Sequence, residues 1–276
     1  MEKPPDAARF VQELAPALRA SAAVARSLEG RVANRPKRNE ATAVKAALTV
    51  ADTAAQEAIL EPLLAHFPDV QVVAEEDTPS VVLFPERAAA VVVIDPIDGT
   101  LRFYLEGLGP YAVLVGLAIG GVYRASLVAL PREELYFEAI AGGGARGSRA
   151  ADPAWQPLRC APSGNRVLVS HDLPAPAVES LLDSGFEVTP GSGGAIAVAP
   201  LIPGVRAGLR LAPQGTVSIR GRIGALVAAE SGARVACETC EPFPRAIDAP
   251  AKALLVAADE EDLNALHRAL AAAGVS

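Results

Sequence analysis

The first 70 residues carry apolar positions at the spacing of amphipathic helices. In the segment Asp6–Leu28, one stripe at a spacing of three to four residues is formed by Phe10, Leu14, Leu18, Ala22, Ala25 and Leu28. This spacing predicts a helix that buries one face, in which Pro16 can introduce a kink. A second helical pattern runs from about Thr53 to Ala65.

The pattern then changes to short apolar runs that are rich in β-branched residues and bounded by turns, which is typical of strands. These runs are Val70–Ala74, Ala89–Ile94, Tyr111–Ile119, Val122–Leu130 and Leu135–Ile140. Because Gly120-Gly121 separates the third run from the fourth, we expect these two strands to form a hairpin. We expect Leu135–Ile140 to continue this hairpin.

Strands and helices alternate in the second half of the chain. The expected strands are Arg166–Ser170, Val205–Leu211 and Ala253–Ala257, and the expected helices are Ala177–Ser184, Ile219–Ser231 and Glu260–Ala273. Around Ala150–Pro162 the chain loses its periodicity and turns to Pro, Asp and Trp. We place a subdomain boundary there, so that residues 1–150 form an N-terminal α+β subdomain and residues 151–276 a C-terminal α/β subdomain.

Three acidic residues follow two of the expected strands. Glu75 comes directly after Val70–Ala74, and Asp95 and Asp98 come after Ala89–Ile94. Because open α/β sheets place their ligands at the carboxyl ends of strands, we expect the three carboxylates to converge there. Crowded carboxylates need neutralisation, and Mg²⁺ held by oxygen ligands is a common solution. The alternative is ordinary turn chemistry at Asp95-Pro96 and Asp98-Gly99.

Several motifs resemble those of one known family. The run Asp95-Pro96-Ile97-Asp98-Gly99-Thr100, with Glu75-Glu76 upstream, resembles the D-P-[IL]-D-G-T signature of the inositol monophosphatase family of Mg²⁺-dependent, lithium-sensitive phosphatases. The similarity extends to Leu48–Glu57, Ala141–Ala145, Gly191–Gly193 and Gly224–Gly232. The resemblance spans nearly the whole chain and implies an α/β fold that is layered as an α/β/α/β/α sandwich.

The resemblance implies a metal site as well. By analogy with the family, Glu75, Asp95 and the backbone carbonyl of Ile97 would hold a first Mg²⁺, for which Mn²⁺ could substitute. Asp95 would bridge to a second cation, to which Asp98 would also bind.

Catalytic and substrate-binding residues follow in the same way. Thr100, supported by Asp52, resembles the residue that orients the attacking water. Asp52 has an alternative role in a capping box with Thr49 at the start of the second helix, and the two roles can coexist. The amides of Gly99 and Thr100 would cradle the phosphate. Gly191 and Ser192 would lie on the substrate side.

One departure from the family pattern changes this expectation. The family's C-terminal motif begins W-D, and its aspartate binds the second metal, but here Ile219-Arg220 occupies these positions. No Asp or Glu occurs between Glu187 and Glu230. An arginine about 4 Å from a second cation would repel it by about 4 kcal/mol at an effective dielectric constant near 20. We therefore expect the second metal to bind poorly.

Three interpretations of Arg220 remain open. Its guanidinium could replace the cation and bind a substrate phosphate, catalysis could be lost and the pocket kept for binding, or the side chain could point to solvent. The loop between Lys45 and Thr49 is also shorter than in the family. The acid that contacts the sugar in inositol-specific members would fall near Ala212-Pro213-Gln214, where no acid occurs, so we do not expect myo-inositol phosphate as substrate.

Composition narrows the range of functions. The chain has 276 residues, of which 51% are hydrophobic, and a net charge of −7, which argues against a nucleic-acid partner. The longest apolar stretch, Ala112–Val122, is too short to span a bilayer, and no secretory signal precedes it, so we expect a soluble cytoplasmic protein. Cys237-Glu238-Thr239-Cys240 lacks a second ligand pair for zinc.

These observations predict a Mg²⁺-dependent phosphomonoesterase that hydrolyses a small phosphorylated metabolite of the sugar, inositol, histidinol or nucleotide phosphate class. The alternative is a catalytically weak or inactive homologue that binds a phosphorylated ligand or a protein partner. The resemblance implies a homodimer.

Overall fold

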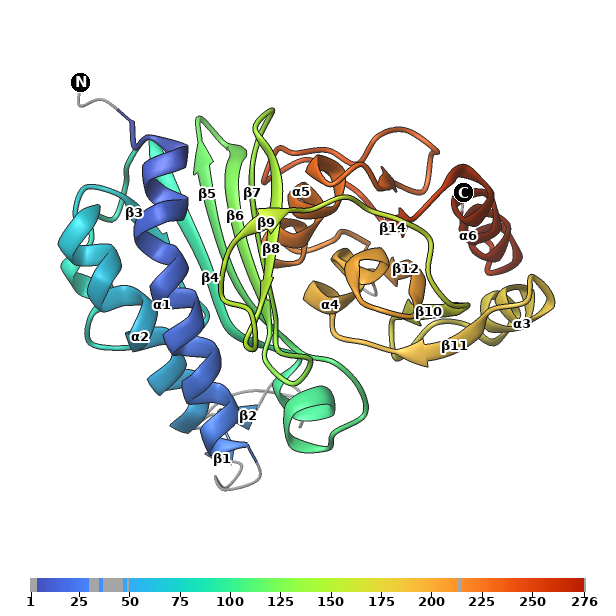
Figure 1. The fold of residues 1–276 in the computed structure, drawn as a ribbon, viewed down its shortest axis with the longest axis horizontal. Coiled ribbons are helices and arrows are strands. Elements are labelled where there is room, and N and C mark those ends of the chain that lie inside the picture. The colour runs from blue at the N-terminus through green and yellow to red at the C-terminus, as the bar shows by residue number, and fades with distance from the viewer. Residues whose placement is uncertain (1–3, 30–34, 37–46, 49, 213–214, 276) are drawn as a thin grey trace.

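Five layers of secondary structure stack along the long axis of the molecule (Figure 1). The structure, a computed structural model, describes residues 4–29, 35–36, 47–48, 50–212 and 215–275. In order, the layers are helices α1 (Ala7–Leu28) and α2 (Val50–His66), a seven-stranded sheet, helices α4 (Gly193–Ala197) and α5 (Ile223–Glu230), a five-stranded sheet, and helices α3 (Ala175–Asp183) and α6 (Glu260–Ala272). This is the α/β/α/β/α sandwich expected from the sequence.

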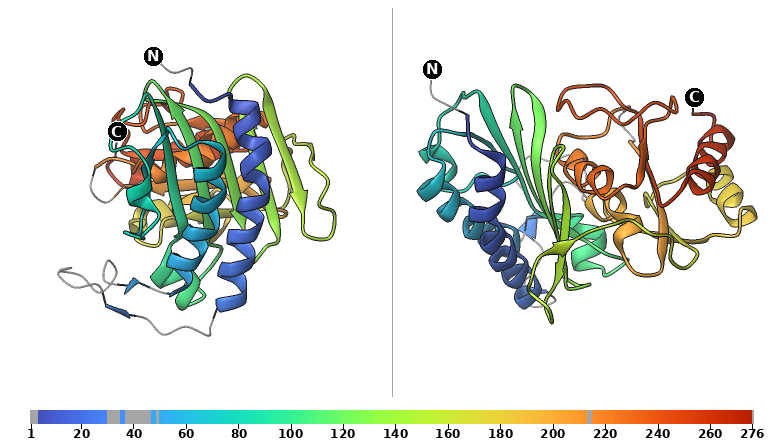
Figure 2. Two further views of the ribbon diagram at one scale, coloured as in Figure 1. Left: turned by 90° about the vertical axis from the view of Figure 1, so that its left-hand side faces the viewer. Right: turned by 45° about the horizontal axis from the view of Figure 1, so that its top comes forward.

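The outer helical layer consists of α1 (Ala7–Leu28) and α2 (Val50–His66), which lie side by side on the large sheet (Figure 2). The Asp6 side chain caps α1 by accepting a hydrogen bond from the Arg9 amide at 2.9 Å. Of the apolar stripe predicted for α1, Phe10, Leu14, Leu18 and Ala22 are buried against α2 and the sheet, Ala25 is buried in a neighbouring cluster, and Leu28 is half-buried. Helix α2 begins at Val50, three residues before the predicted Thr53, so Asp52 lies inside its first turn.

The large sheet has the strand order β3-β4-β5-β6-β7-β8-β9, with β3 parallel to β4 and every other pair antiparallel. Its strands are β3 (Gln71–Val73), β4 (Ala90–Asp98), β5 (Ala112–Ile119), β6 (Val122–Leu130), β7 (Leu135–Ile140), β8 (Gly144–Arg149) and β9 (Gln156–Pro157). A short pair, β1 (Arg35–Pro36) and β2 (Ala47–Leu48), lies apart from it. Strand β9 follows the subdomain boundary predicted at 150 but belongs to this sheet.

Strand β4 differs from the sequence prediction at its carboxyl end. The prediction ended this strand at Ile94 and placed Asp95 in a turn, but the strand continues to Asp98. Its pairing with β5 shifts between Asp95 and Asp98, because Asp95 faces Leu114 and Asp98 faces Ala112. The D-P-I-D segment therefore forms an irregular strand end, which redirects its side chains.

The small sheet has the order β11-β10-β12-β14-β13. Its strands are β10 (Arg166–Val169), β11 (Glu187–Pro190), β12 (Val205–Leu211), β13 (Arg234–Ala236) and β14 (Ala253–Ala257). Strand β10 runs parallel to both β11 and β12. Strands β1, β2, β8, β9, β11 and β13 were not predicted, because they are short or lack an uninterrupted apolar run.

Small residues allow the middle layer to pack tightly between the sheets. This layer contains α4 (Gly193–Ala197) and α5 (Ile223–Glu230), and the 3₁₀ turn Arg220–Arg222 precedes α5. A Cβ atom at Gly224 would lie 2.7 Å from the Cβ of Ala197, so only glycine permits this approach. Helices α3 (Ala175–Asp183) and α6 (Glu260–Ala272) cover the far face of the small sheet (Figure 1).

Three further short helical segments are the 3₁₀ turns Val81–Leu83 and Ala199–Leu201 and the π-helical turn Thr100–Leu105. Within the described ranges, no helix is both long enough and apolar enough to cross a membrane.

Candidate functional site

Glu75 and Asp95 form a pair of acids at the carboxyl ends of the parallel strands β3 and β4. The Asp95 side chain is buried, with 5% of the residue exposed. Burial, followed by the negative charges of Glu75 and Asp98, raises the pKa of the Asp95 carboxyl well above its ordinary value. Oε2 of Glu75 and Oδ1 of Asp95 are enclosed and have no hydrogen-bond partner. Such a pair favours either a shared proton or a bound cation.

Gln56 holds the loop that carries Glu75. Its Nε2 donates to the carbonyl of Glu76 at 2.7 Å and to Oγ1 of Thr78 at 2.9 Å, and its Oε1 accepts from the Glu76 amide at 3.0 Å. Gln56 is fully buried on α2. This role was not predicted from the sequence, although a glutamine on the buried face of a helix indicates a hydrogen bond to another segment.

The predicted partnership of Thr100 and Asp52 is present. Oγ1 of Thr100 lies 3.0 Å from Oδ1 of Asp52 and 2.9 Å from the carbonyl oxygen of Ile97. Asp52 is completely buried in the first turn of α2, where its carboxylate can accept the hydrogen bond from Thr100. Thr49, the other half of the alternative capping box, lies outside the described residues, and of the shortened loop before it only Ala47–Leu48, strand β2, is described.

Asp98 does not join the other two acids as closely as expected. Its Oδ2 accepts a hydrogen bond from the Gly194 amide at 2.5 Å, which partly neutralises its charge. Throughout the described ranges, no three acidic, histidine or cysteine side chains converge into a metal-binding cluster. The expected three-carboxylate cluster is therefore corrected to a Glu75–Asp95 pair with Asp98 nearby, close enough to raise the pKa of Asp95.

Arg220 lies at the site rather than in solvent. Its Nη2 donates to the carbonyl of Ala74 at 2.7 Å, and its Nε donates to the carbonyl of Ile94 at 3.3 Å. These two carbonyls directly precede Glu75 and Asp95, so the guanidinium joins the ends of β3 and β4. Its positive charge lowers the pKa of Asp95 and so opposes the larger upward shift from burial and the two acids.

Gly99 allows the D-G-T turn to approach the C-terminal half of the chain. Its φ is +90°, and a Cβ atom there would lie 2.6 Å from Cδ2 of Phe103 and 2.9 Å from Cβ of Ser192. Ser192 is itself buried, and its Oγ caps α4 by accepting from the Ala195 amide at 3.3 Å. Gly191 donates its amide to the carbonyl of Val169 at 3.0 Å. The structure therefore gives both of these residues a structural role beside the turn.

The chemistry of the donor atoms fits a hard divalent cation. Two carboxylate oxygens without partners, on Glu75 and Asp95, are buried together, and the carbonyl of Ile97 lies in the same irregular strand end. Mg²⁺ prefers oxygen ligands and usually keeps several waters, so it needs only one or two carboxylates. These three residues could therefore hold one such ion.

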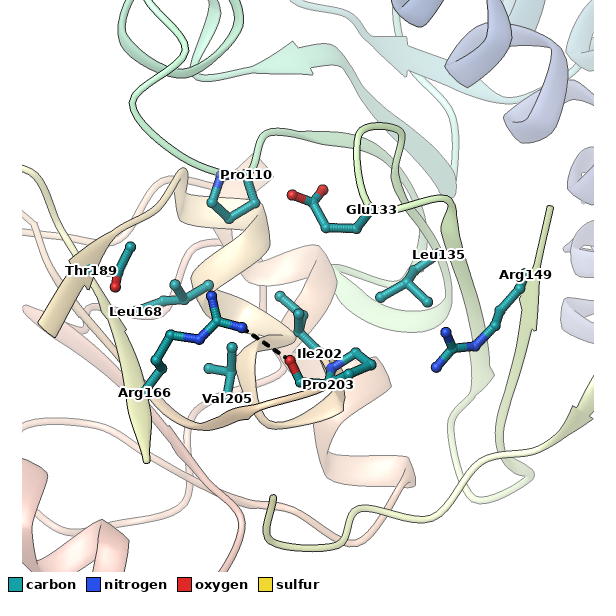
Figure 3. Close-up of a pocket in the computed structure, with 10 residues that line it drawn as sticks. All are labelled: Pro110, Glu133, Leu135, Arg149, Arg166, Leu168, Thr189, Ile202, Pro203 and Val205. Carbon is teal, nitrogen blue, oxygen red and sulfur yellow. Dashed lines mark hydrogen bonds between the residues drawn. The ribbon is translucent and has the colours of Figure 1, made fainter. Parts of the chain in front are cut away.

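Other candidate sites lack this chemistry. A cavity of about 280 Å³ lies between the two sheets and is lined by Pro110, Glu133, Leu135, Arg149, Arg166, Leu168, Thr189, Ile202, Pro203 and Val205 (Figure 3). It contains none of the predicted site residues. Of the two cysteines in the C-x-x-C segment, Cys240 has its Sγ 3.4 Å from Nδ1 of His267, and Cys237 has its Sγ 3.1 Å from Oγ1 of Thr239.

Comparison of the sequence with known proteins identifies relatives. The inositol monophosphatase family matches residues 11–175, which is more than half of the chain. A fructose-1,6-bisphosphatase/inositol-1-monophosphatase of Thermotoga maritima is 33% identical over 122 residues, 44% of each chain. The Nus factor SuhB of Pasteurella multocida is 32% identical over 99 residues, 36% of each chain. The matched segments thus span less than half of the length of these relatives.

Structural similarity covers more of the chain. An IMPase of Thermotoga maritima superposes with a TM-score of 0.72 over 95% of this chain and 98% of its own, at 18% identity. This similarity supports the fold alone. The family match ends at residue 175, so it includes Asp52, Glu75 and Asp95 but not Arg220.

Proposed function

Since this chain belongs to the inositol monophosphatase family, we propose that it is a Mg²⁺-dependent phosphomonoesterase acting on a small phosphorylated metabolite. The observation that carries the proposal is the hydrogen bond between Thr100 and Asp52 beside the buried pair Glu75 and Asp95. Phosphomonoester hydrolysis needs a positioned water and neutralised phosphoryl oxygens. These residues can provide both.

Glu75, Asp95 and the carbonyl of Ile97 are proposed to hold the cation, with Mn²⁺ as an alternative to Mg²⁺. A divalent cation at this position would neutralise phosphoryl oxygens and lower the pKa of a water molecule. Gln56 holds the Glu75 loop in place, so the separation of the two carboxylates is fixed by α2 and the sheet together.

Thr100 and Asp52 are proposed to orient the attacking water. When the Thr100 hydroxyl donates to Asp52, its oxygen can accept a hydrogen bond from water and so direct the water lone pair toward phosphorus. Asp52 is buried beside Thr100 and can take up the proton that Thr100 relays. The amides of Gly99 and Thr100 would bind phosphate oxygens, with Gly191 and Ser192 on the substrate side.

Arg220 is proposed to take the place of a second cation. Its guanidinium is fixed by the carbonyls of Ala74 and Ile94 and acts electrostatically on Asp95. A guanidinium in this position can donate to a phosphate oxygen without requiring a further metal ligand. We therefore expect one divalent ion per site. We also propose that the protein forms a homodimer, as its family membership implies.

A second candidate is a catalytically weak or inactive homologue that binds a phosphorylated ligand or a protein partner. The contact of Asp98 with the Gly194 amide favours it, because this acid is engaged by the protein instead of being free to bind a metal.

A phosphatase screen separates the two candidates. Phosphosugars, histidinol phosphate and nucleotide bisphosphates should be assayed with Mg²⁺, with Mn²⁺ and with chelator, using Asp95→Asn as control. Metal-dependent release of phosphate that Asp95→Asn abolishes would support the enzyme. Absence of turnover, together with ligand binding, would support the inactive homologue.

A further inference from the structure

Arg210 is a charged side chain with no role in the proposed metal binding or water activation. It lies near the carboxyl end of β12, which spans Val205–Leu211. Its Nη1 is enclosed and has no hydrogen-bond partner. Among the residues that the structure describes, no acid pairs with its guanidinium. Arg210 is half-buried, and an enclosed guanidinium nitrogen without a partner is costly unless another group completes it.

Two glycines build the slot in which this guanidinium lies. A Cβ atom at Gly193 or at Gly221 would overlap Nη1 of Arg210, so any other residue at either position would displace the side chain. The two glycines come from different elements, α4 and the 3₁₀ turn before α5. The position of the guanidinium is therefore fixed by the tertiary structure.

The slot adjoins the proposed catalytic site on two sides. Gly193 precedes Gly194, whose amide binds Asp98 at 2.5 Å. Gly221 follows Arg220, whose guanidinium joins the strand ends beside Glu75 and Asp95. An anion held by Arg210 would thus lie next to the reacting phosphate without occupying its place.

Other arginines flank Arg210 in this part of the chain. Residues 188–229 contain four arginines and no acid. Of these arginines, Arg206 pairs with Asp259 and Asp262. Arg222 donates to the carbonyls of Val217, Ala246 and Ala249. Burial lowers the pKa of Arg222; Tyr123 and Asp248 oppose this shift, and the positive charge of Arg210 adds to it. Arg210 therefore has a positive neighbour in Arg222 and, among the described residues, no carboxylate paired with it.

We propose that Arg210 binds a second anionic group of the substrate, so that the preferred substrates are phosphomonoesters that also carry another phosphate or a carboxylate. The inference rests on the proposed function for the identity of the reacting group. A guanidinium suits both anions because its planar fork matches two oxygens. A polyol phosphate that carries no second anionic group would leave Arg210 without a partner and should bind less well.

Matched substrate pairs test this preference in the unaltered protein. 3-Phosphoglycerate differs from glycerol 3-phosphate by a carboxylate, and a hexitol 1,6-bisphosphate differs from the hexitol 6-phosphate by a phosphate. We expect KM to be at least about tenfold lower for the member with two anionic groups in one pair or both. This factor corresponds to the contribution of about 1.5 kcal/mol that a hydrogen bond to a charged group makes. The responding pair identifies the anion. Equal KM values within both pairs would overturn the inference.

Arg210→Gln tests whether this residue causes the preference. We expect KM for the substrate with two anionic groups to rise about tenfold. We expect kcat for both members of the pair, and KM for the member with one anionic group, to stay within about twofold. Arg234→Gln is the control, because it removes an exposed arginine from another strand of the same sheet. A preference that survives Arg210→Gln would overturn the assignment, as would an equal loss for both members. Should Arg210→Gln fold poorly, Arg210→Met can replace it.

Equilibrium binding separates this inference from the proposed function. Calorimetric titration of the same four compounds, with Ca²⁺ in place of Mg²⁺ to suppress turnover, measures affinity alone. A preference that depends on Arg210 in a protein without phosphatase activity would leave the inference standing and refute the proposed enzyme. Turnover without any preference for the second anionic group would support the proposed enzyme and refute the role of Arg210.

Discussion

The hydroxyl of Thr100 lies 3.0 Å from Oδ1 of Asp52, which connects the turn after β4 to the first turn of α2. These residues are 48 positions apart in the chain. Because Asp52 is completely buried, its carboxylate has little freedom to turn elsewhere. The relationship gives the proposed water-orienting step a fixed geometry.

Removal of this hydroxyl should lower kcat more than it changes KM. We expect Thr100→Ala and Asp52→Asn each to reduce kcat by about 10²–10⁴, the usual contribution of positioned proton transfer. Thr100→Ser keeps the hydroxyl and should retain most activity. Steady-state kinetics on any substrate found in the screen provides the measurement. Comparable activity in Thr100→Ala and Thr100→Ser would contradict the role.

Asp95→Asn should stabilise the protein when no metal is bound. The folded-state pKa of Asp95 is raised, so its contribution to stability is present below its unfolded pKa and is lost as the pH rises through the folded value. Replacement by Asn removes that loss. We expect a gain in Tm of about 2–4 °C, which corresponds to about 1 kcal/mol in a domain of this size, at pH 8 and a smaller gain at pH 4.

The same variant should lose its response to metal. Millimolar Mg²⁺ should raise the Tm of the unaltered protein, because a ligand that binds only the folded state stabilises it. Asp95→Asn should show equal Tm values with Mg²⁺ and with chelator. A response of equal size in both proteins would place the metal site elsewhere.

Arg220→Asp should exchange a fixed cation for a metal ligand. Without metal, loss of the charged hydrogen bonds to Ala74 and Ile94 should lower the free energy of unfolding by about 1.5–3 kcal/mol. The new carboxylate lowers it further, because it is a third acid near Asp95, after Glu75 and Asp98. With Mg²⁺ the variant should regain stability and bind more metal. Arg220→Ala loses the same bonds without adding a ligand. Equal metal affinity in Arg220→Asp and Arg220→Ala would show that no second cation site can form here.

Gly99→Ala should damage the site through backbone strain and close contact. Position 99 has a φ of +90°, and a Cβ atom there would lie 2.9 Å from that of Ser192. We expect a loss of about 2–4 kcal/mol, made up of about 1–2 from the left-handed backbone and the rest from overpacking. Gly107→Ala is the matched control, because its φ is +74° but no atom lies within 4 Å of the added Cβ. Denaturant unfolding of both variants separates the two contributions.

Gln56→Met should loosen the loop that positions Glu75. The change leaves the buried amide and carbonyl of Glu76 without the partners that they have now, which should cost about 1–3 kcal/mol. Because Glu75 directly precedes Glu76 in this loop, Mg²⁺ affinity should fall as well. Calorimetric metal titration at a temperature where the variant is folded tests this directly. Unchanged affinity would mean that Glu75 is held by other contacts.

The sequence alone determined the local features of this protein. Apolar periodicity predicted the stripe of α1 and most long strands, since burying one face of an element requires a fixed spacing of apolar residues. The D-P-I-D-G-T run identified Asp95 and Thr100 and, through the family resemblance, the link of Thr100 to Asp52. The short strands β8, β11 and β13 were missed, because their pairing depends on neighbours that are distant in the chain.

Only the tertiary structure decided how the charges are arranged. The sequence placed Asp98 with Glu75 and Asp95, but a hydrogen bond from the amide of Gly194 engages it instead. It left Arg220 with three interpretations, and two strand-end carbonyls fixed its place. Nothing in the sequence singled out Arg210, because its slot is built by Gly193 and Gly221 from separate elements. Such contacts depend on packing between layers, and no local pattern encodes them.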